Sequence, residues 1–174
     1  TMRVRFKGDA PLGVTAKDLA LAMIAKAGIG GATGHVIEYA GPAIEALDME
    51  GRMTLCNLSI EAGARAGMVA PDDVTIEYLR GRPGVQEDVE RAEAEWRTVY
   101  TDEGARVVQE VGVAVAALAP MVTYGVVPDA GAPVTESLPV ADNDDLKDAY
   151  DYMGLSAGTP LNSVKIDRIF IGSC

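Results

Sequence analysis

Strand-like and helix-like segments alternate along the first part of the chain, and this alternation constrains the fold more than any other feature. Residues 2–7 alternate apolar and charged side chains, which is the pattern of a half-buried strand. Thr15 and Asp18 form an N-cap pair that predicts a helix over 16–26. The same signals predict strands over 35–39 and 67–69, and helices that begin at Pro42 and that cover 51–66 and 71–80. Such alternation is typical of an α/β fold, in which helices pack against a sheet.

Farther along, the pattern predicts the end of one domain and the start of another. Residues 86–97 are charged and predict an exposed helix, and residues 111–118 are apolar and predict a strand or a helix. Proline and glycine gather in 124–143, which indicates a linker or a long loop. Asp144 is then expected to cap a helix that ends at Met153.

This linker sets the expected domain organisation. Residues 1–123 are expected to form one α/β domain, and residues 144–174 the truncated start of the next α/β domain. Residues 164–171 predict a buried strand, and the sequence stops shortly after it. Because both ends look cut, we expect an internal fragment of a longer protein.

Charge and composition exclude several classes of function. The formal net charge of −11 argues against a nucleic-acid-binding surface, which is basic, and against an anionic membrane as a partner. No apolar run approaches the roughly 20 residues of a membrane-spanning helix. The chain has two cysteines and no segment that resembles a secretory signal, so we expect reduced thiols and a cytoplasmic location.

The predicted helix over 51–66 is apolar almost all round, except for a narrow polar stripe of Thr54, Asn57 and Glu61. A helix of this kind is expected to be buried, so the stripe should face a polar pocket or a partner. Asn57 and Glu61 are four residues apart and therefore share a face. From the pattern alone, an internal structural pair, such as Glu61 with Arg65, is a simpler interpretation than a catalytic carboxylate.

Three further residues are candidates for metal chemistry. Cys174 would lie just past the carboxyl end of a strand, where α/β proteins place functional groups, although it could equally be a small buried residue. One cysteine cannot hold an iron–sulfur cluster, which takes several thiolates. We expect Cys56 to be structural, and His35 has no second ligand at metal spacing.

Several stretches of the sequence resemble the large subunits of 3-isopropylmalate dehydratases, which belong to the aconitase superfamily, and they keep the order of that family. These stretches are 31–41 (GATGHVIEYAG), 49–67 (MEGRMTLCNLSIEAGARAG), 69–73 (VAPDD), 78–82 (YLRGR), 119–125 (APMVTYG) and 170–174 (FIGSC). The resemblance covers most of the chain.

The resemblance implies a three-layer α/β/α iron–sulfur domain, namely the second domain of the large subunit and the start of the third. It also implies a hydro-lyase that isomerises 2-isopropylmalate to 3-isopropylmalate, by dehydration and rehydration, in leucine biosynthesis. In this family three cysteines hold a [4Fe-4S] cluster, and Cys174 matches the first of them. Asn57 and Glu61 match two active-site residues of the superfamily. The implied partners are a small subunit, the other domains of the large subunit and a small-molecule dicarboxylate.

Other parts of the family's site lie outside these residues, including the paired cysteines and the upstream catalytic Asp and His residues. So do the substrate-binding arginines and the catalytic serine of the small subunit. The 174 residues alone are therefore expected to be inactive and to bind no cluster. Homoaconitase, a dimethylmalate dehydratase or another hydro-lyase of the superfamily is the nearest alternative. A binding module that kept this domain and lost the chemistry is an alternative of a different class.

Overall fold

The computed structural model describes residues 1–85 and 89–172. Its strands are β1 (Met2–Lys7), β2 (Val36–Ala40), β3 (Ala66–Val69), β4 (Gln109–Ala114), β5 (Met121–Thr123) and β6 (Gly131–Pro133). Its α-helices are α1 (Ala16–Ala27), α2 (Pro42–Glu45), α3 (Met49–Leu58), α4 (Asp73–Leu79), α5 (Val89–Trp96) and α6 (Asp144–Met153). Two short 3₁₀ turns are η1 (Ile60–Ala62) and η2 (Leu161–Ser163).

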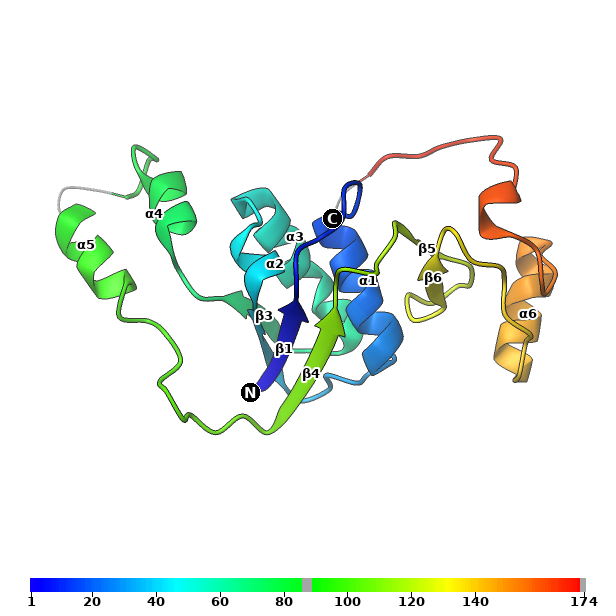
Figure 1. Ribbon diagram of the computed structural model, residues 1–174, viewed down its shortest axis with the longest axis horizontal. Helices are drawn as coiled ribbons and strands as arrows, with labels where there is room; N and C mark the ends of the chain where they lie inside the picture. Colours follow the sequence, from blue (N-terminus) through cyan, green and yellow to red (C-terminus); the bar gives the residue numbers. More distant parts are fainter. Residues whose placement is uncertain (86–88, 173–174) are drawn as a thin grey trace.

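A parallel sheet in the order β3-β2-β1-β4 forms the centre of the molecule (Figure 1). Met2 of β1 pairs with Ile37 of β2 on one side and with Gln109 of β4 on the other. Parallel neighbours need crossover connections, and here the crossovers run through helices, as in other α/β folds. The predicted α/β class is therefore confirmed, and the strands predicted at 2–7, 35–39 and 67–69 are each confirmed to within one residue.

One face of the sheet is apolar and packs against α1 and α3, which also pack against each other. Met2, Val4 and Phe6 alternate along β1 and are fully buried on this face. They meet buried residues of α1, β2, α3 and β4, which include Leu19, Met23, Ile24, Ile37, Tyr39, Leu55 and Val113. The period-two pattern of β1 thus places its apolar half in the core.

The opposite face of the sheet carries charges. Arg3 forms an ion pair with Glu38 at 3.3 Å, and Arg5 forms one with Glu110 at 3.7 Å. The hydroxyl of Thr101 donates a 2.9 Å hydrogen bond to Glu38, so the segment before β4 lies over part of this face. The second helical layer of a three-layer α/β/α arrangement would lie on this side of the sheet.

Helix α3 differs from its prediction in length and in burial. The predicted helix over 51–66 is wrong at its end, because α3 stops at Leu58 and the chain turns through η1 into β3. Gly63 makes this turn with a φ of +82°, a left-handed conformation that glycine adopts readily. The expectation of burial almost all round is also wrong, since Met53 is 46% exposed and Ile60 is 56% exposed.

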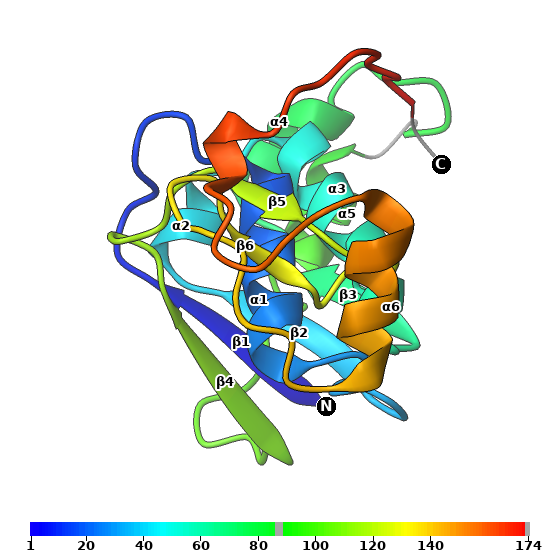
Figure 2. The same ribbon diagram turned by 90° about the vertical axis from the view of Figure 1, so that its right-hand side faces the viewer.

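Residues beyond β4 build a second, smaller apolar cluster next to α1 (Figure 2). Strand β5 pairs antiparallel with β6, and Ala132 of β6 is buried with Leu138, Tyr150 and Leu161. The predicted linker 124–143 therefore contains a strand, β6, and contributes to a core. Helix α6 matches its prediction, except that its N-cap is Asn143, whose side chain accepts from the amide of Leu146 at 2.8 Å.

The buried strand predicted over 164–171 is wrong. This segment has no regular secondary structure, and Ile169, Phe170 and Ile171 are 82%, 94% and 92% exposed. A strand needs a neighbour for its backbone N–H and C=O groups, and within the described residues no strand lies beside this segment. A search of that same part of the chain finds no helix that is both long enough and apolar enough to cross a membrane.

Candidate functional site

The two predicted catalytic residues, Asn57 and Glu61, lie where α3 ends and the chain turns toward β3. Asn57 lies in the last turn of α3, and Glu61 is the middle residue of η1. Both side chains are exposed. Within the described residues, no ion pair joins Glu61 to Arg65, and Arg65 is itself exposed. The structural interpretation required Glu61 to be buried in the core and paired with Arg65. In the structure Glu61 is exposed and does not form that pair.

Ser59 anchors this turn from inside the core. Its side chain is fully buried and lies 2.7 Å from the hydroxyl of Tyr39 on β2. The Ser59 hydroxyl also donates a 3.2 Å hydrogen bond to the carbonyl of Leu55. Its backbone carbonyl accepts from the amides of Ala62 and Ala64, both at 3.2 Å. One residue thus ties the end of α3 to the sheet and bends the chain through η1.

Two glycines allow the close packing of this turn. A Cβ on Gly67 would lie 2.1 Å from Oγ of Ser59, so a side chain there would displace the anchor. A Cβ on Gly63 would lie 2.7 Å from Oγ1 of Thr33 in the glycine-rich loop 28–34. That loop also donates from the amide of Ala32 to the carbonyl of Ala62 at 3.0 Å. The loop therefore packs against the turn and helps to hold η1 in place.

Burial sets the chemistry of the groups behind the turn. Removal from water raises the pKa of Tyr39 to about 12, although its hydrogen bond with Ser59 acts in the opposite direction. Burial likewise raises the pKa of the Cys56 thiol. A thiol with a raised pKa is a poor nucleophile and a poor metal ligand at neutral pH, which agrees with a structural role for Cys56. Nδ1 of His35 lies 3.0 Å from the carbonyl oxygen of Thr33, which accepts a hydrogen bond when Nδ1 carries the proton.

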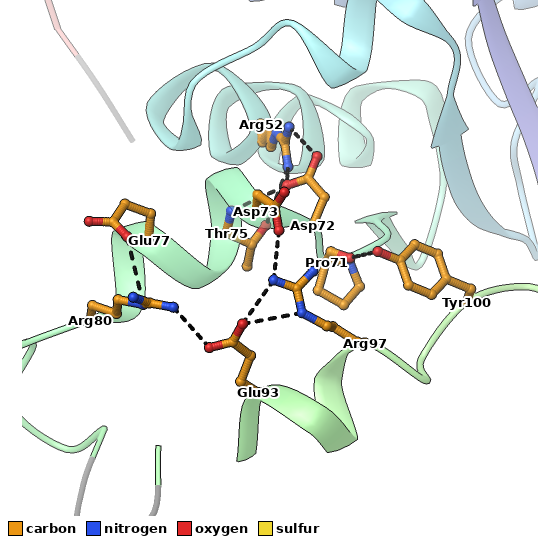
Figure 3. A network of polar contacts seen from close by, with 10 residues as sticks. All are labelled: Arg52, Pro71, Asp72, Asp73, Thr75, Glu77, Arg80, Glu93, Arg97 and Tyr100. Atoms are coloured by element: carbon orange, nitrogen blue, oxygen red, sulfur yellow. Dashed lines mark hydrogen bonds and ion pairs between the residues drawn. The ribbon is translucent and has the colours of Figure 1, made fainter. Parts of the chain in front are cut away.

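A buried arginine fixes the other end of α3 (Figure 3). Arg52 is 2% exposed and binds both carboxylate oxygens of Asp72, at 2.6 and 2.8 Å. It also donates to the backbone carbonyls of Leu47 and Glu45, both at 3.0 Å. Asp72 is in turn the N-cap of α4 and accepts from the amide of Thr75 at 3.2 Å. The guanidinium therefore joins α2, α3 and α4 at one point.

The same figure shows how α5 is attached. Arg97 binds Glu93 at 2.8 Å and Asp73 at 2.6 Å, and Glu93 also binds Arg80 at 3.0 Å. The hydroxyl of Tyr100 donates to the carbonyl of Pro71. Most of these side chains are exposed, and ion pairs between exposed side chains contribute little to stability. They attach α5 to α4 rather than form a reaction site.

The described residues do not form a metal site. No group of three His, Cys, Asp or Glu side chains in residues 1–85 and 89–172 is placed to hold an ion. Cys56, the cysteine that lies in those ranges, is partly buried in the core. Cys174, the predicted cluster ligand, lies outside the described residues. The residues present therefore do not fit an iron–sulfur cluster by themselves.

Ser59, Tyr39 and Arg52 are not among the residues predicted from the sequence. Ser59 and Tyr39 carry no pattern that distinguishes them from ordinary helix and strand residues. Arg52 did carry a signal, because an arginine within a largely apolar helix has to find a partner. That partner could be sought only in the structure, since Asp72 is 20 residues away.

Comparisons with known proteins give the family of this chain. A family model described as "Aconitase family (aconitate hydratase)" matches residues 1–174. A protein of Anaeromyxobacter dehalogenans, named 3-isopropylmalate dehydratase large subunit, is 52% identical over 183 aligned positions. The alignment covers all of this chain and 38% of that protein, so the chain spans less than half the length of its relative. A whole-length family match and this identity together show that the chain belongs to the aconitase family.

Proposed function

We propose that this chain is part of the large subunit of a 3-isopropylmalate dehydratase, a hydro-lyase that moves a hydroxyl group between neighbouring carbons of a dicarboxylate. The observation that carries the proposal is the 52% identity, along the whole chain, to a protein of that name. The placement of Asn57 and Glu61 supports it, because both reach solvent on a turn whose backbone is held from inside the core.

We assign the catalytic roles to these two residues. The carboxylate of Glu61 would accept a hydrogen bond from the hydroxyl group that the substrate loses and regains. As an acceptor it would hold that hydroxyl group in one orientation, and it would act as the acid–base group for its proton. The amide of Asn57 carries both donors and an acceptor, and it would orient neighbouring groups of the site. Both roles require that the two side chains face a space closed by other parts of the enzyme.

The remaining components come from outside the described residues. Enzymes of the aconitase family generally use a [4Fe-4S] cluster, and we propose Cys174 as one of its three thiolate ligands. The other two thiolates cannot come from these 174 residues, because Cys56 is packed in the core. A small subunit, the other large-subunit domains and a cytoplasmic location belong to the same proposal. So do the domain boundaries 1–123, 124–143 and 144–174.

The test uses the full-length large subunit, reconstituted anaerobically with its small subunit and assayed for iron and sulfide. Dehydration of 2-isopropylmalate is followed by the ultraviolet absorbance of the unsaturated acid. Turnover of 2-isopropylmalate in preference to homoaconitate and 2,3-dimethylmalate supports the proposal. Preference for homoaconitate or for 2,3-dimethylmalate would instead identify the protein as one of the alternative hydro-lyases. Binding without turnover of any of them would favour a non-catalytic module.

A further inference from the structure

The backbone alone fixes the position of Glu61 in this structure. Within the described residues, its carboxylate makes no ion pair and no side-chain hydrogen bond. The turn that carries it is short, and its backbone bonds run to Ser59, to Ile60 and to the loop 28–34. The amides of Ala62 and Ala64 donate to Ser59, and the amide of Gly63 donates to Ile60. Because two of these bonds end on Ser59, the placement of the carboxylate depends on how firmly Ser59 is held.

Ser59 is held by a chain of hydroxyl contacts. Oγ of Ser59 lies 3.2 Å from the carbonyl of Leu55 and 2.7 Å from the hydroxyl of Tyr39, and its single hydrogen can serve one of these contacts. Both hydroxyl groups are satisfied when Ser59 donates to Leu55 and Tyr39 donates to Ser59. Tyr39 keeps that proton at neutral pH, because burial raises its pKa to about 12. The order Tyr39 to Ser59 to Leu55 thus links the central sheet to the last turn of α3.

We propose that Tyr39 and Ser59 are positioning residues for Glu61: their buried hydroxyl pair sets where the η1 turn holds the catalytic carboxylate. This inference rests on the proposed function for the role of Glu61. It goes beyond that function because neither hydroxyl touches the substrate. The amides of Ala62 and Ala64 both donate to the carbonyl of Ser59. A shift of that carbonyl therefore moves these amides, and Glu61, which precedes Ala62, moves with them.

Tyr39→Phe is the sharpest test, because it removes one proton and leaves the ring in the core. Ser59 keeps its bond to Leu55, so the helix end persists while its tie to the sheet is lost. In the assembled enzyme, Tyr39→Phe should lower kcat about 10-fold and leave KM within about twofold, since misplacement by about 1 Å can reduce a rate about 100-fold. Ser59→Ala should lower kcat further, because it removes both bonds.

Tyr150→Phe is the matched control. Tyr150 is also a buried tyrosine with one hydrogen bond, a 3.0 Å donation to the carbonyl of Pro139 in the second cluster. The substitution Tyr150→Phe should lower the midpoint of thermal unfolding about as much as Tyr39→Phe does, and it should leave kcat unchanged. Equal losses of stability with unchanged kcat in both variants would overturn the proposal and leave Tyr39 a purely structural residue.

A double-mutant cycle with Glu61→Gln asks whether Tyr39 acts through Glu61. Residues that act as a unit are not additive, so Tyr39→Phe should have little further effect on kcat in the Glu61→Gln background. An undiminished effect in that background would overturn the inference.

Hydrogen exchange tests the geometry without any activity. In the full-length large subunit, the amides of Ala62 and Ala64 should exchange about 10-fold faster in Tyr39→Phe and at the wild-type rate in Tyr150→Phe. Unchanged exchange in Tyr39→Phe would refute the positioning inference even in an active enzyme. A wild-type assembly without hydro-lyase activity would instead refute the proposed function.

Discussion

Oδ1 of Asp18 accepts a 2.7 Å hydrogen bond from the backbone amide of Met121, 103 residues farther along the chain. Its other oxygen, Oδ2, accepts from the amide and the hydroxyl of Thr15, both at 2.7 Å. A residue expected only to cap α1 therefore also fixes the start of β5, which joins the second cluster to α1. The carboxylate is 7% exposed, so these donors replace the water that it loses on folding.

Asp18→Asn should destabilise the chain by about 1–3 kcal/mol, because one oxygen becomes an NH₂ that faces donors at Thr15 or at Met121. The measurement is the free energy of unfolding in urea. Asp48→Asn is the control: Asp48 is an exposed N-cap of α3 that accepts from Gly51 at 2.8 Å, and asparagine caps a helix as well as aspartate does. Equal effects of the two substitutions would contradict the dual role of Asp18.

The pair of Arg52 and Asp72 predicts a specific dependence of stability on pH. Hydrogen bonds from Arg52 hold the pKa of Asp72 below its usual value. A carboxyl whose pKa is lower in the folded state stabilises that state above its unfolded pKa of about 3.9. The contribution is then lost as the pH falls through the folded-state pKa.

Asp72→Asn keeps a good N-cap for α4 and removes the charge that Arg52 binds. The Asp72 side chain is 32% exposed, so solvent screening limits the loss of stability to about 1–2 kcal/mol at pH 7. The difference in unfolding free energy between wild type and Asp72→Asn should be the same at pH 7 and pH 5, and should shrink below about pH 4. A difference that persists undiminished to pH 3 would show that the charge of Asp72 is not its source.

Local signals in the sequence were sufficient for β1, β2, β3 and α1, whereas the pattern over 111–118 left a strand or a helix open where β4 (Gln109–Ala114) lies. The alternation in β1 and the cap formed by Thr15 and Asp18 act within a few residues, so they could be interpreted without a structure. The order of the strands could not, since it depends on which crossovers pack together. The aconitase-type α/β fold followed from the resemblance and is shown by the family match.

The errors arose where contacts distant in sequence decide the outcome. The helical pattern continues past Leu58, but pairing of β3 with β2 requires the chain to reverse before Ala66. The apolar run at 164–171 has the composition of a strand and lacks a neighbour among the described residues. The partners of Arg52 and Ser59, which are Asp72 and Tyr39, could not be predicted either, because they lie on other elements that are distant in the sequence.

Gly67 should tolerate no side chain, because its Cβ would lie 2.1 Å from Oγ of Ser59 and 2.9 Å from Cα of Cys56. Gly67→Ala should therefore cost about 3 kcal/mol or more, the upper range for overpacking a close-packed core. Gly112→Ala on β4 is the control, since the nearest atom to its Cβ is the flexible end of Lys7 at 3.5 Å. That substitution should be neutral or stabilise by up to about 1 kcal/mol. Urea unfolding of both variants tests the prediction, and similar stabilities for the two would contradict it.

Glu61→Gln separates a catalytic carboxylate from a structural one. In the full enzyme it should lower kcat about 10²–10³-fold, within the usual contribution of a positioned acid–base group, and leave the cluster content unchanged. In the 174-residue chain it should change the unfolding free energy by less than about 0.5 kcal/mol, because the side chain is exposed and no described residue forms an ion pair with it.

Glu50→Gln is the matched control, since Glu50 is an exposed carboxylate in the first turn of α3, the helix that leads into η1. It should leave both kcat and stability nearly unchanged. A structural role for Glu61 with Arg65 gives the opposite pattern, in which Glu61→Gln lowers the unfolding free energy and spares kcat. A catalytic role predicts a loss of kcat without a loss of stability, and a structural role predicts the reverse. Measurements of kcat and of urea unfolding on Glu61→Gln and Glu50→Gln therefore decide between the two roles.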